Sequence, residues 1–298
     1  MRVLITGAGG LLGGRLSTLL ASRCEVAGVV RRSPAPPGVE TIGADLVDPN
    51  QVAAALARKR PGAVVHCAAL ADADVCERDP GLARRENVEA TRVLAAACGA
   101  TSTRLVTIST DLVFNGGESF AKETDEARPI MEYGRSKLAA EAITLAAASD
   151  AVVLRVALIS GRGFGPRLTS TEGVALRLAR SEPVTLYEDE WRTPVDPPSV
   201  AAAILAVLER PKAFGCFHLA GPERLTRAEI GERVASTLGL DASLIKRGAQ
   251  ASHRGAPRPR DVSLDNTRAK SELGWSPQAF DLAIREGRLD PASTSAVP

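Results

Sequence analysis

Hydrophobic residues in the first half of the chain fall into short, nearly continuous runs separated by longer stretches rich in alanine and leucine. Such runs are typical of parallel strands that are covered on both faces and joined by crossover helices. The pattern predicts strands at 2–6, 25–30, 41–43, 63–66, 104–108 and 151–156, and helices at 11–21, 49–58, 80–97 and 131–148. Asp-Pro pairs at 48–49 and 79–80 supply an N-cap carboxylate and a first-turn proline for two of these helices.

The alternation loosens after residue 157, where a glycine-rich stretch at 161–166 leads into helices and short strands with proline-rich connections. We therefore predict an α/β protein with a Rossmann-type doubly wound parallel sheet over residues 1–157. A smaller C-terminal α/β substrate-binding cap is predicted over 158–288, some segments of which can return to the first domain. Residues 289–298 are small and polar, and we expect a disordered tail there.

A glycine-rich turn follows the first predicted strand and opens the first predicted helix. Its glycines allow a tight turn, close approach of backbone to a pyrophosphate, and close packing of helix on sheet, while the helix N-terminus offers free N–H groups. A purely structural glycine-rich turn is the alternative. The residues predicted to contact a dinucleotide here are Gly7, Gly9, Gly10, Leu11, Leu12 and Gly13.

The second predicted strand is followed by Arg31 and Arg32, where an NAD-selective site would carry Asp or Glu for the ribose 2′-hydroxyl. Guanidinium groups suit a 2′-phosphate because they are permanently charged and match phosphate oxygens in geometry. The sequence thus predicts NADP(H) rather than NAD(H), with a solvated strand end as the alternative. Further cofactor contacts are expected after the third and fourth strands, at Asp45, Leu46, Cys67, Ala68 and Ala69. Contacts with the cofactor are also expected at Asn87, Ser109, Tyr133 and Lys137.

Tyr133 and Lys137 stand four residues apart at the start of a predicted helix, so their side chains project from one face. Hydride reduction of a carbonyl needs a proton donor for the oxygen, and a phenol beside an ammonium group can serve. We expect Lys137 to lower the pKa of Tyr133 and to anchor the nicotinamide ribose. A surface pair with no chemical role is the alternative.

Ser109, Thr110 and Asp111 close the fifth predicted strand, at the carboxyl edge where open α/β sheets bind ligands. A hydroxyl at this edge can donate to the substrate carbonyl oxygen beside the tyrosine. Either Thr110 or Ser109 could take that role, and plain capping of the strand end is the alternative.

Taken together, the glycine turn and the Tyr133-x-x-x-Lys137 pair resemble an extended short-chain dehydrogenase/reductase. Further stretches resemble the dTDP-4-dehydrorhamnose reductase branch of that family, and they extend to about Trp275. The resemblance implies that Thr110, Tyr133 and Lys137 are catalytic and that NADPH donates the hydride. The matching stretches are Ala68-Ala69 with Asp74 and Glu77, Asn87, Ser109 to Phe114, Glu123 to Asp125 with Pro129, Arg155, Arg258-Pro259 and Leu264-Asp265.

The chain departs from that branch in its expected substrate pocket. An aromatic residue is expected where Leu112 stands, and a tryptophan near Leu158, whereas aromatic residues make up only 3% of this chain. A carbonyl substrate is predicted, with the 4-keto group of a dTDP-linked deoxysugar as one form of it. The expected substrate contacts are Asp111, Leu112, Leu158, Arg192 and Arg258, the two arginines because they stand beside prolines in loops.

Composition removes several other classes of function. The 37 Lys and Arg residues nearly balance 35 Asp and Glu and are mixed along the chain, which disfavours nucleic-acid binding. There is no 18-residue apolar stretch, and the five cysteines are odd in number with no Cys-x-x-Cys pair, so we expect a cytoplasmic protein without membrane contact. Three histidines without carboxylate or cysteine partners at ligand spacing predict no metal site.

Two other functions remain open on the same fold. An NAD-dependent nucleotide-sugar epimerase or dehydratase is disfavoured by the two arginines and by Thr110-Asp111-Leu112, because dehydratases of the family carry Thr-Asp-Glu. The second is a non-catalytic NADP-binding subunit, like the regulatory subunit of methionine adenosyltransferase that this branch also resembles. By analogy with the fold, a homodimer paired through helices is expected.

Overall fold

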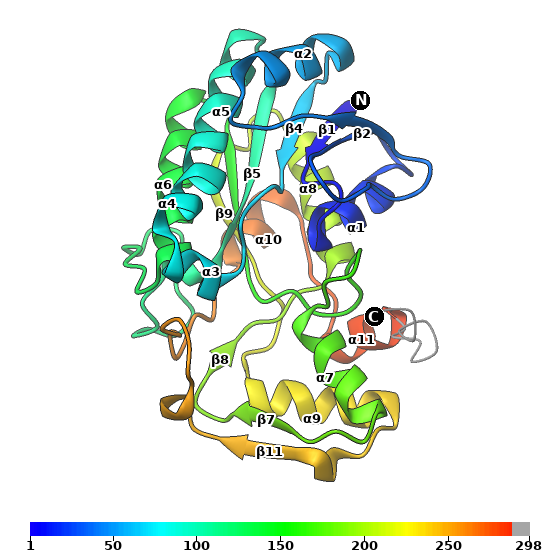
Figure 1. Cartoon of the computed structure of the whole chain (residues 1–298), viewed down its shortest axis with the longest axis vertical. Coiled ribbons are helices and arrows are strands. Elements are labelled where there is room, and N and C mark those ends of the chain that lie inside the picture. The colour runs from blue at the N-terminus through cyan, green and yellow to red at the C-terminus, as the bar shows by residue number, and fades with distance from the viewer. Residues whose placement is uncertain (288–298) are drawn as a thin grey trace.

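A seven-stranded parallel sheet forms the centre of the protein in the computed structural model, which describes residues 1–287 (Figure 1). The strand order is β3-β2-β1-β4-β5-β6-β9, and every neighbouring pair is parallel. The prediction of a Rossmann-type doubly wound sheet is thereby confirmed. The strands are β1 Arg2–Thr6, β2 Glu25–Val30, β3 Glu40–Gly43, β4 Ala63–His66, β5 Arg104–Thr110, β6 Val152–Val156 and β9 Gly215–Leu219.

Helices cover both faces of this sheet because alternate strand residues point to opposite sides. Leu4, Val64 and Leu105 pack on one face, whereas Ile5 and Val106 belong to the core on the other. The first face carries α2 Pro49–Lys59, α5 Ala90–Ala100 and α6 Glu132–Ala147, and the second carries α1 Leu11–Leu20, α8 Pro197–Leu208 and α10 Thr267–Leu273 (Figure 1).

The cap lies beyond the carboxyl edge of the sheet and has its own small apolar core (Figure 1). Its parallel strand pair packs against two helices, and a two-residue antiparallel pair lies toward the main sheet. Its elements are α7 Ser170–Ala179, β7 Val184–Tyr187, β8 Trp191–Arg192, β10 Leu225–Thr226, α9 Arg227–Leu238, η3 Ala242–Leu244, β11 Ile245–Gly248, η4 Gln250–Ser252 and α11 Phe280–Glu286.

The chain does not divide into two consecutive halves. After it enters the cap it returns to the main sheet with α8, which packs on α1, and with β9, which pairs with β6. It returns again with α10, beside β9. The division at residue 157 therefore describes where the cap begins, and the predicted tail at 289–298 lies outside the described residues.

One predicted helix is less regular than expected, and one helix was not predicted. The helix expected at 80–97 is instead α4 Pro80–Ala83, a π-helical stretch η1 Arg84–Glu89 and then α5, and a further helix, α3 Ala73–Arg78, precedes them. Insertion of a wider turn is a tertiary adjustment that apolar periodicity does not reveal. A short 3-10 turn, η2 Asp111–Val113, follows β5 directly.

Candidate functional site

The glycine turn between β1 and α1 has the geometry of an anion-binding cradle. Gly7 has φ +69°, and the N–H of Gly10 donates to its carbonyl at 2.8 Å. A Cβ on Gly13 would lie 2.3 Å from that same carbonyl oxygen, so only glycine fits. No side chain caps the first turn of α1, which leaves its N–H groups available. These residues fit a dinucleotide pyrophosphate.

Charged side chains gather where β2 and β3 end. Arg31 pairs with Glu86 at 2.7 Å and with Asp45 at 3.6 Å, and Arg85 pairs with Asp45 at 2.9 Å. Arg32, the second predicted contact, is exposed beside them. Sequence analysis missed Arg85, because η1 brings it close to two strands that lie far from it in the chain.

The segment after β4 forms a wall facing the glycine turn. The Ala68 N–H donates to the Thr6 hydroxyl at 3.2 Å, and burial raises the pKa of the Cys67 thiol to about 12, so the thiol stays neutral. Asn87 is 1% exposed; it accepts from the Leu70 N–H at 2.7 Å and donates to the Ser136 hydroxyl at 2.8 Å. Asn87 therefore ties this wall to α6. Leu46 packs at the edge of the core under α2.

Thr110, Tyr133 and Lys137 come together between the end of β5 and the start of α6. A Cβ on Gly134 would lie 2.2 Å from the Leu112 carbonyl oxygen, so glycine at this position lets α6 press against the strand end. The Thr110 hydroxyl is then within hydrogen-bonding reach of the Tyr133 phenol. Lys137 lies one turn further along and is 3% exposed.

Burial sets the protonation of this group. Desolvation raises the pKa of Tyr133 far above its ordinary value, and the neighbouring Asp111 carboxylate adds to the rise. Burial lowers the pKa of Lys137 to about 8, which Glu141 opposes. The expectation that Lys137 lowers the pKa of Tyr133 was therefore wrong for the ligand-free protein. The phenol is neutral at physiological pH and holds a proton to donate.

Ser109 points away from this group. Its hydroxyl donates to the Glu141 carboxylate, which also forms a buried ion pair with Arg155 at 2.8 Å. Successive strand residues face opposite sides, so only one of Ser109 and Thr110 can face the phenol, and it is Thr110. Ser109 thus supports α6 through Glu141, and its contact with the cofactor stays a prediction.

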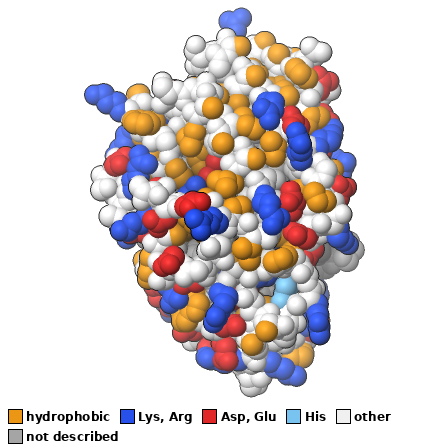
Figure 2. All heavy atoms as spheres, turned by 90° about the vertical axis from the view of Figure 1, so that its left-hand side faces the viewer, with side chains coloured by type: hydrophobic (Ala, Val, Ile, Leu, Met, Phe, Trp, Pro, Cys, Tyr) orange, Lys and Arg blue, Asp and Glu red, His pale blue; other side chains and the backbone are white. Residues whose placement is uncertain are grey.

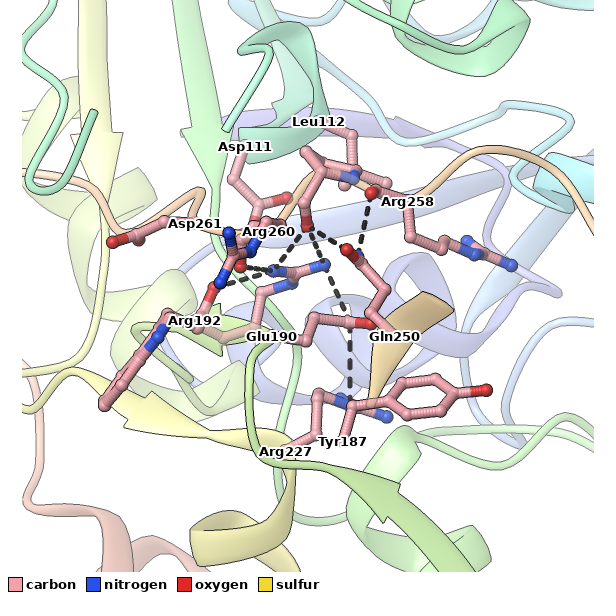
Figure 3. Close-up of polar contacts among 12 residues, drawn as sticks. Asp111, Leu112, Tyr187, Glu190, Arg192, Arg227, Gln250, Arg258, Arg260 and Asp261 are labelled. Atoms are coloured by element: carbon pink, nitrogen blue, oxygen red, sulfur yellow. Dashed lines mark hydrogen bonds and ion pairs between the residues drawn. The ribbon is translucent and has the colours of Figure 1, made fainter. Parts of the chain in front are cut away.

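Predicted substrate contacts meet where the end of β5 faces the cap (Figure 3). Asp111 and Leu112 lie in η2, directly after β5. Arg258 lies opposite them, and its guanidinium is 4.0 Å from the carboxylate of Asp74 in α3. Leu158 is different, because it packs against the core of the cap.

Arg192 was expected in a loop with its guanidinium open to a ligand, and this was wrong. It lies in β8, is 4% exposed, and its terminal nitrogens donate to Glu190 and to the carbonyls of Trp191 and Pro259 (Figure 3). Buried charge must be paired, so Arg192 fixes the segment around residue 259.

Arg227 was missed by sequence analysis. It opens α9 and donates to the Ser170 hydroxyl at 2.8 Å. It lies 3.9 Å from Glu190 and near Arg192 and Arg258, and Asp111 faces it from the end of β5 (Figure 3). The capping box of Thr226 and Glu229 located the helix start. A capping pattern does not show what the first helical side chain meets.

Two general properties follow from the described part of the chain. Residues 1–287 contain no group of three or more His, Cys, Asp or Glu side chains that could hold a metal ion. None of the helices in this range is long and apolar enough to cross a lipid bilayer.

Comparison with known families decides the classification. The model of the RmlD substrate binding domain matches residues 1–288. The chain belongs to this family. It is thus an oxidoreductase of the extended short-chain dehydrogenase/reductase type, as the glycine turn and the Tyr133-Lys137 pair indicated.

Three curated relatives match nearly the whole chain. The probable low-salt glycan biosynthesis reductase Agl14 of Haloferax volcanii is 34% identical over 99% of this chain and 100% of its own length. The probable dTDP-4,6-dihydroxy-2-methyloxan-3-one 4-ketoreductase of Streptomyces antibioticus is 34% identical over 97% and 95%. The methionine adenosyltransferase 2 subunit beta of Bos taurus is 31% identical over 96% and 86%.

Solved structures agree with this classification. A hypothetical dTDP-4-dehydrorhamnose reductase from Sulfolobus tokodaii has 32% identity and a TM-score of 0.85, covering 95% of this chain and 99% of that one. MoeE5 in complex with UDP-glucuronic acid and NAD has 27% identity and a TM-score of 0.84, covering 96% and 98%.

Proposed function

We propose that the protein is an NADPH-dependent reductase that transfers hydride to the ketone of a nucleotide-linked sugar. The observation that carries this is the neutral phenol of Tyr133 beside the Thr110 hydroxyl. Thr110 ends the parallel strand β5, and Tyr133 approaches it from the start of α6, at the edge of the sheet from which the glycine turn also projects. A proton donor and a dinucleotide cradle therefore share one edge of the sheet.

The chain's residues divide the chemistry among them. A reduced nicotinamide supplies the hydride when bound. Tyr133 gives its phenolic proton to the carbonyl oxygen as the carbonyl carbon becomes an alcohol carbon, and Thr110 turns its hydroxyl hydrogen from Asp111 Oδ1 to the same oxygen. Lys137, whose pKa is about 8, is an ammonium group at neutral pH and stabilises the phenolate that Tyr133 becomes.

Preference for NADPH rests on the guanidinium groups at the adenosine end. Arg31 and Arg85 are held by the carboxylates of Glu86 and Asp45 in the ligand-free protein. A 2′-phosphate carries more charge than either carboxylate and fits the same donors, so Arg31 and Arg85 are the residues that would hold it.

This preference is tested by measuring the affinities of Arg31→Ala for NADPH and NADH by calorimetry. Loss of a charge-assisted contact should weaken NADPH binding by about ten- to a hundredfold and leave NADH binding within about threefold. Arg128→Ala, on the exposed loop before α6, is the control. Equal losses for both dinucleotides would contradict the assignment.

The nucleotide-sugar class rests on the relatives and on charge. Relatives of this chain are named for dTDP-sugar ketones, and MoeE5 is a complex with a UDP-sugar. Arg227 and Arg258 face the gap in which such a substrate would lie, and neither has its guanidinium fully used by neighbours as Arg192 has. They suit the diphosphate, because guanidinium groups bind phosphate oxygens strongly.

The decisive assay follows NADPH oxidation with a dTDP-linked 4-keto-6-deoxyhexose and identifies the product alcohol. Wild type should turn over, and Tyr133→Phe should not. Protein purified with tightly held NAD that is recycled, with no net NADPH oxidation, would favour an epimerase or dehydratase instead.

A second candidate is a binding subunit, which the 31% identity to methionine adenosyltransferase 2 subunit beta favours. It predicts that wild type and Tyr133→Phe are equally inert on every ketone. It also predicts a stable complex with a methionine adenosyltransferase catalytic chain. Ketone turnover that depends on Tyr133 would exclude it as the principal function.

The homodimer stays a prediction, and its place is the outer surface of α5 and α6. Figure 2 looks onto the side of the molecule where these helices lie and shows apolar side chains among charged ones. Leu145 is 41% exposed there, and Ala96, Ala100 and Ala142 are exposed as well. Light scattering on wild type and Ala142→Glu measures the state directly, since a charge in a paired-helix interface should dissociate it.

A further inference from the structure

The side chain of Asp111 is a buried carboxyl group, and one of its two oxygens makes no hydrogen bond within residues 1–287. Asp111 follows Thr110 at the end of β5 and is 4% exposed. Its Oδ1 accepts a hydrogen bond from the Thr110 hydroxyl at 3.1 Å. Its Oδ2 is buried and has no hydrogen-bond partner among residues 1–287. A buried polar atom of this kind is costly and needs an explanation.

The charges around Asp111 do not supply the missing partner. Arg192 of β8 and Arg227 of α9 face it from the cap, and Tyr133 faces it from α6. The terminal nitrogens of Arg192 are already used by Glu190 and backbone carbonyls (Figure 3). Arg227 donates to Ser170 and pairs with Glu190 at 3.9 Å. Burial outweighs these cations and raises the pKa of Asp111 to about 6.

The place of Oδ2 limits what can donate to it. The same carboxyl group accepts a hydrogen bond from the Thr110 hydroxyl, which we assign to the substrate carbonyl oxygen. A donor on the substrate that reaches Oδ2 must therefore lie close to that carbonyl. An ammonium group would be repelled by the guanidiniums of Arg192 and Arg227. A phosphate would be repelled by the carboxylate itself. A neutral hydroxyl satisfies both constraints.

We propose that Asp111 Oδ2 accepts a hydrogen bond from a hydroxyl on the carbon next to the reacting carbonyl, so that the substrate is an α-hydroxy ketone. This inference rests on the proposed reductase function and narrows its substrate. A site built to bind a substrate hydroxyl rejects the analogue that lacks it, because its buried acceptor then stays unpaired. Asp111 thus determines specificity.

The test pairs two substrates with two variants. A dTDP-linked 4-keto-6-deoxyglucose and its 3-deoxy analogue differ only in the hydroxyl beside the ketone. Wild type should prefer the hydroxy ketone in kcat/KM by about a hundredfold or more. Asp111→Ala should bring the two substrates within about threefold, mainly by lowering the value for the hydroxy ketone.

Asp196→Asn is the matched control. Asp196 is another buried carboxyl, 3% exposed, whose pKa burial also raises, but it lies at the start of α8 beside Ser199. It should keep the wild-type ratio of the two substrates. A general loss of packing would lower both rates and leave the ratio unchanged, and that result in Asp111→Ala would overturn the proposal.

Calorimetry with the two ketones separates this inference from the reductase function. A preference of about tenfold or more for the hydroxy ketone that disappears in Asp111→Ala supports the role of Asp111, even in a protein that oxidises no NADPH. Equal affinity of wild type for both ketones overturns it, whatever the turnover. Folding of each variant is checked by circular dichroism and by its affinity for NADPH.

Discussion

The two sides of the candidate site are built in different ways. The pyrophosphate end of the dinucleotide side rests on backbone from one contiguous segment, residues 6–13, in which glycines bring N–H groups and a helix N-terminus together. The substrate side rests on side chains from separate elements: Asp111 after β5, Arg192 in β8, Arg227 in α9 and Arg258 after β11 (Figure 3). One side is local and the other is assembled.

This difference has consequences for stability. Residues 6–13 carry no charged side chain, and the Gly10 N–H is satisfied within the turn by the Gly7 carbonyl. The substrate side instead buries charges of both signs, and one carboxylate oxygen of Asp111 stays without a partner among the described residues. The buried charges on the substrate side therefore lower the stability of the fold, whereas the backbone of the glycine turn does not.

The largest expected effect is a loss of turnover in Tyr133→Phe with little change in its affinity for the cofactor. Tyr133→Phe removes the proton donor but keeps the ring, so kcat should fall by about 10²- to 10⁴-fold. The glycine turn is untouched, and the affinity for NADPH should stay within about threefold. Stopped-flow reduction of the ketone and calorimetry with NADPH measure the two quantities. Loss of NADPH affinity would show that the two sides are not separable.

Gly13→Ala tests the opposite case. The new Cβ would overlap the Gly7 carbonyl oxygen, so the turn must open and NADPH should bind about a hundredfold or more weakly, or ~3 kcal/mol. Gly173→Ala in α7 is the control, because a Cβ there meets nothing within 4 Å. Wild-type affinity in Gly13→Ala would refute the idea that this backbone forms the cradle.

Lys137 stands between the two sides, and its effect is intermediate. Burial lowers its pKa from 10.5 to about 8, so the ammonium group is present below pH 8 and is lost as the pH rises through 8. Since kcat/KM reports the free enzyme, it should fall about tenfold across this range. The Lys137→Met variant should have a low kcat/KM at every pH, without the fall around pH 8. An unchanged fall in the variant would assign it to another group.

The smallest expected effect is on the free energy of unfolding, which the buried carboxylate of Asp111 lowers. Its folded-state pKa of about 6 lies above the ordinary 3.8, so the folded protein binds more protons between these values and loses stability as the pH rises through them. Asp111→Asn has no such loss. It should be more stable than wild type by on the order of 1–2 kcal/mol at pH 7, and equal below pH 4. Urea unfolding at both pH values measures this, and a less stable variant at pH 7 would contradict it.

The sequence alone predicted six of the seven strands of the Rossmann sheet closely, because short, near-continuous apolar runs bounded by turn residues are typical of strands buried on both faces. It also located the glycine turn and the pair of Tyr133 and Lys137. These features depend on residues within one turn or one loop of each other, where backbone geometry follows from local sequence. Cofactor class and family follow from them.

Other properties were decided only by the tertiary structure. Which of Ser109 and Thr110 faces the phenol depends on the orientation of β5 in the sheet, and the burial of Arg192 and the position of Arg227 depend on how the cap packs over its edge. The pKa of Tyr133 also shifts in the direction opposite to expectation, because desolvation by parts of the chain distant in sequence raises it. Electrostatics and contacts across space depend on what surrounds a residue, and its neighbours in sequence do not specify that.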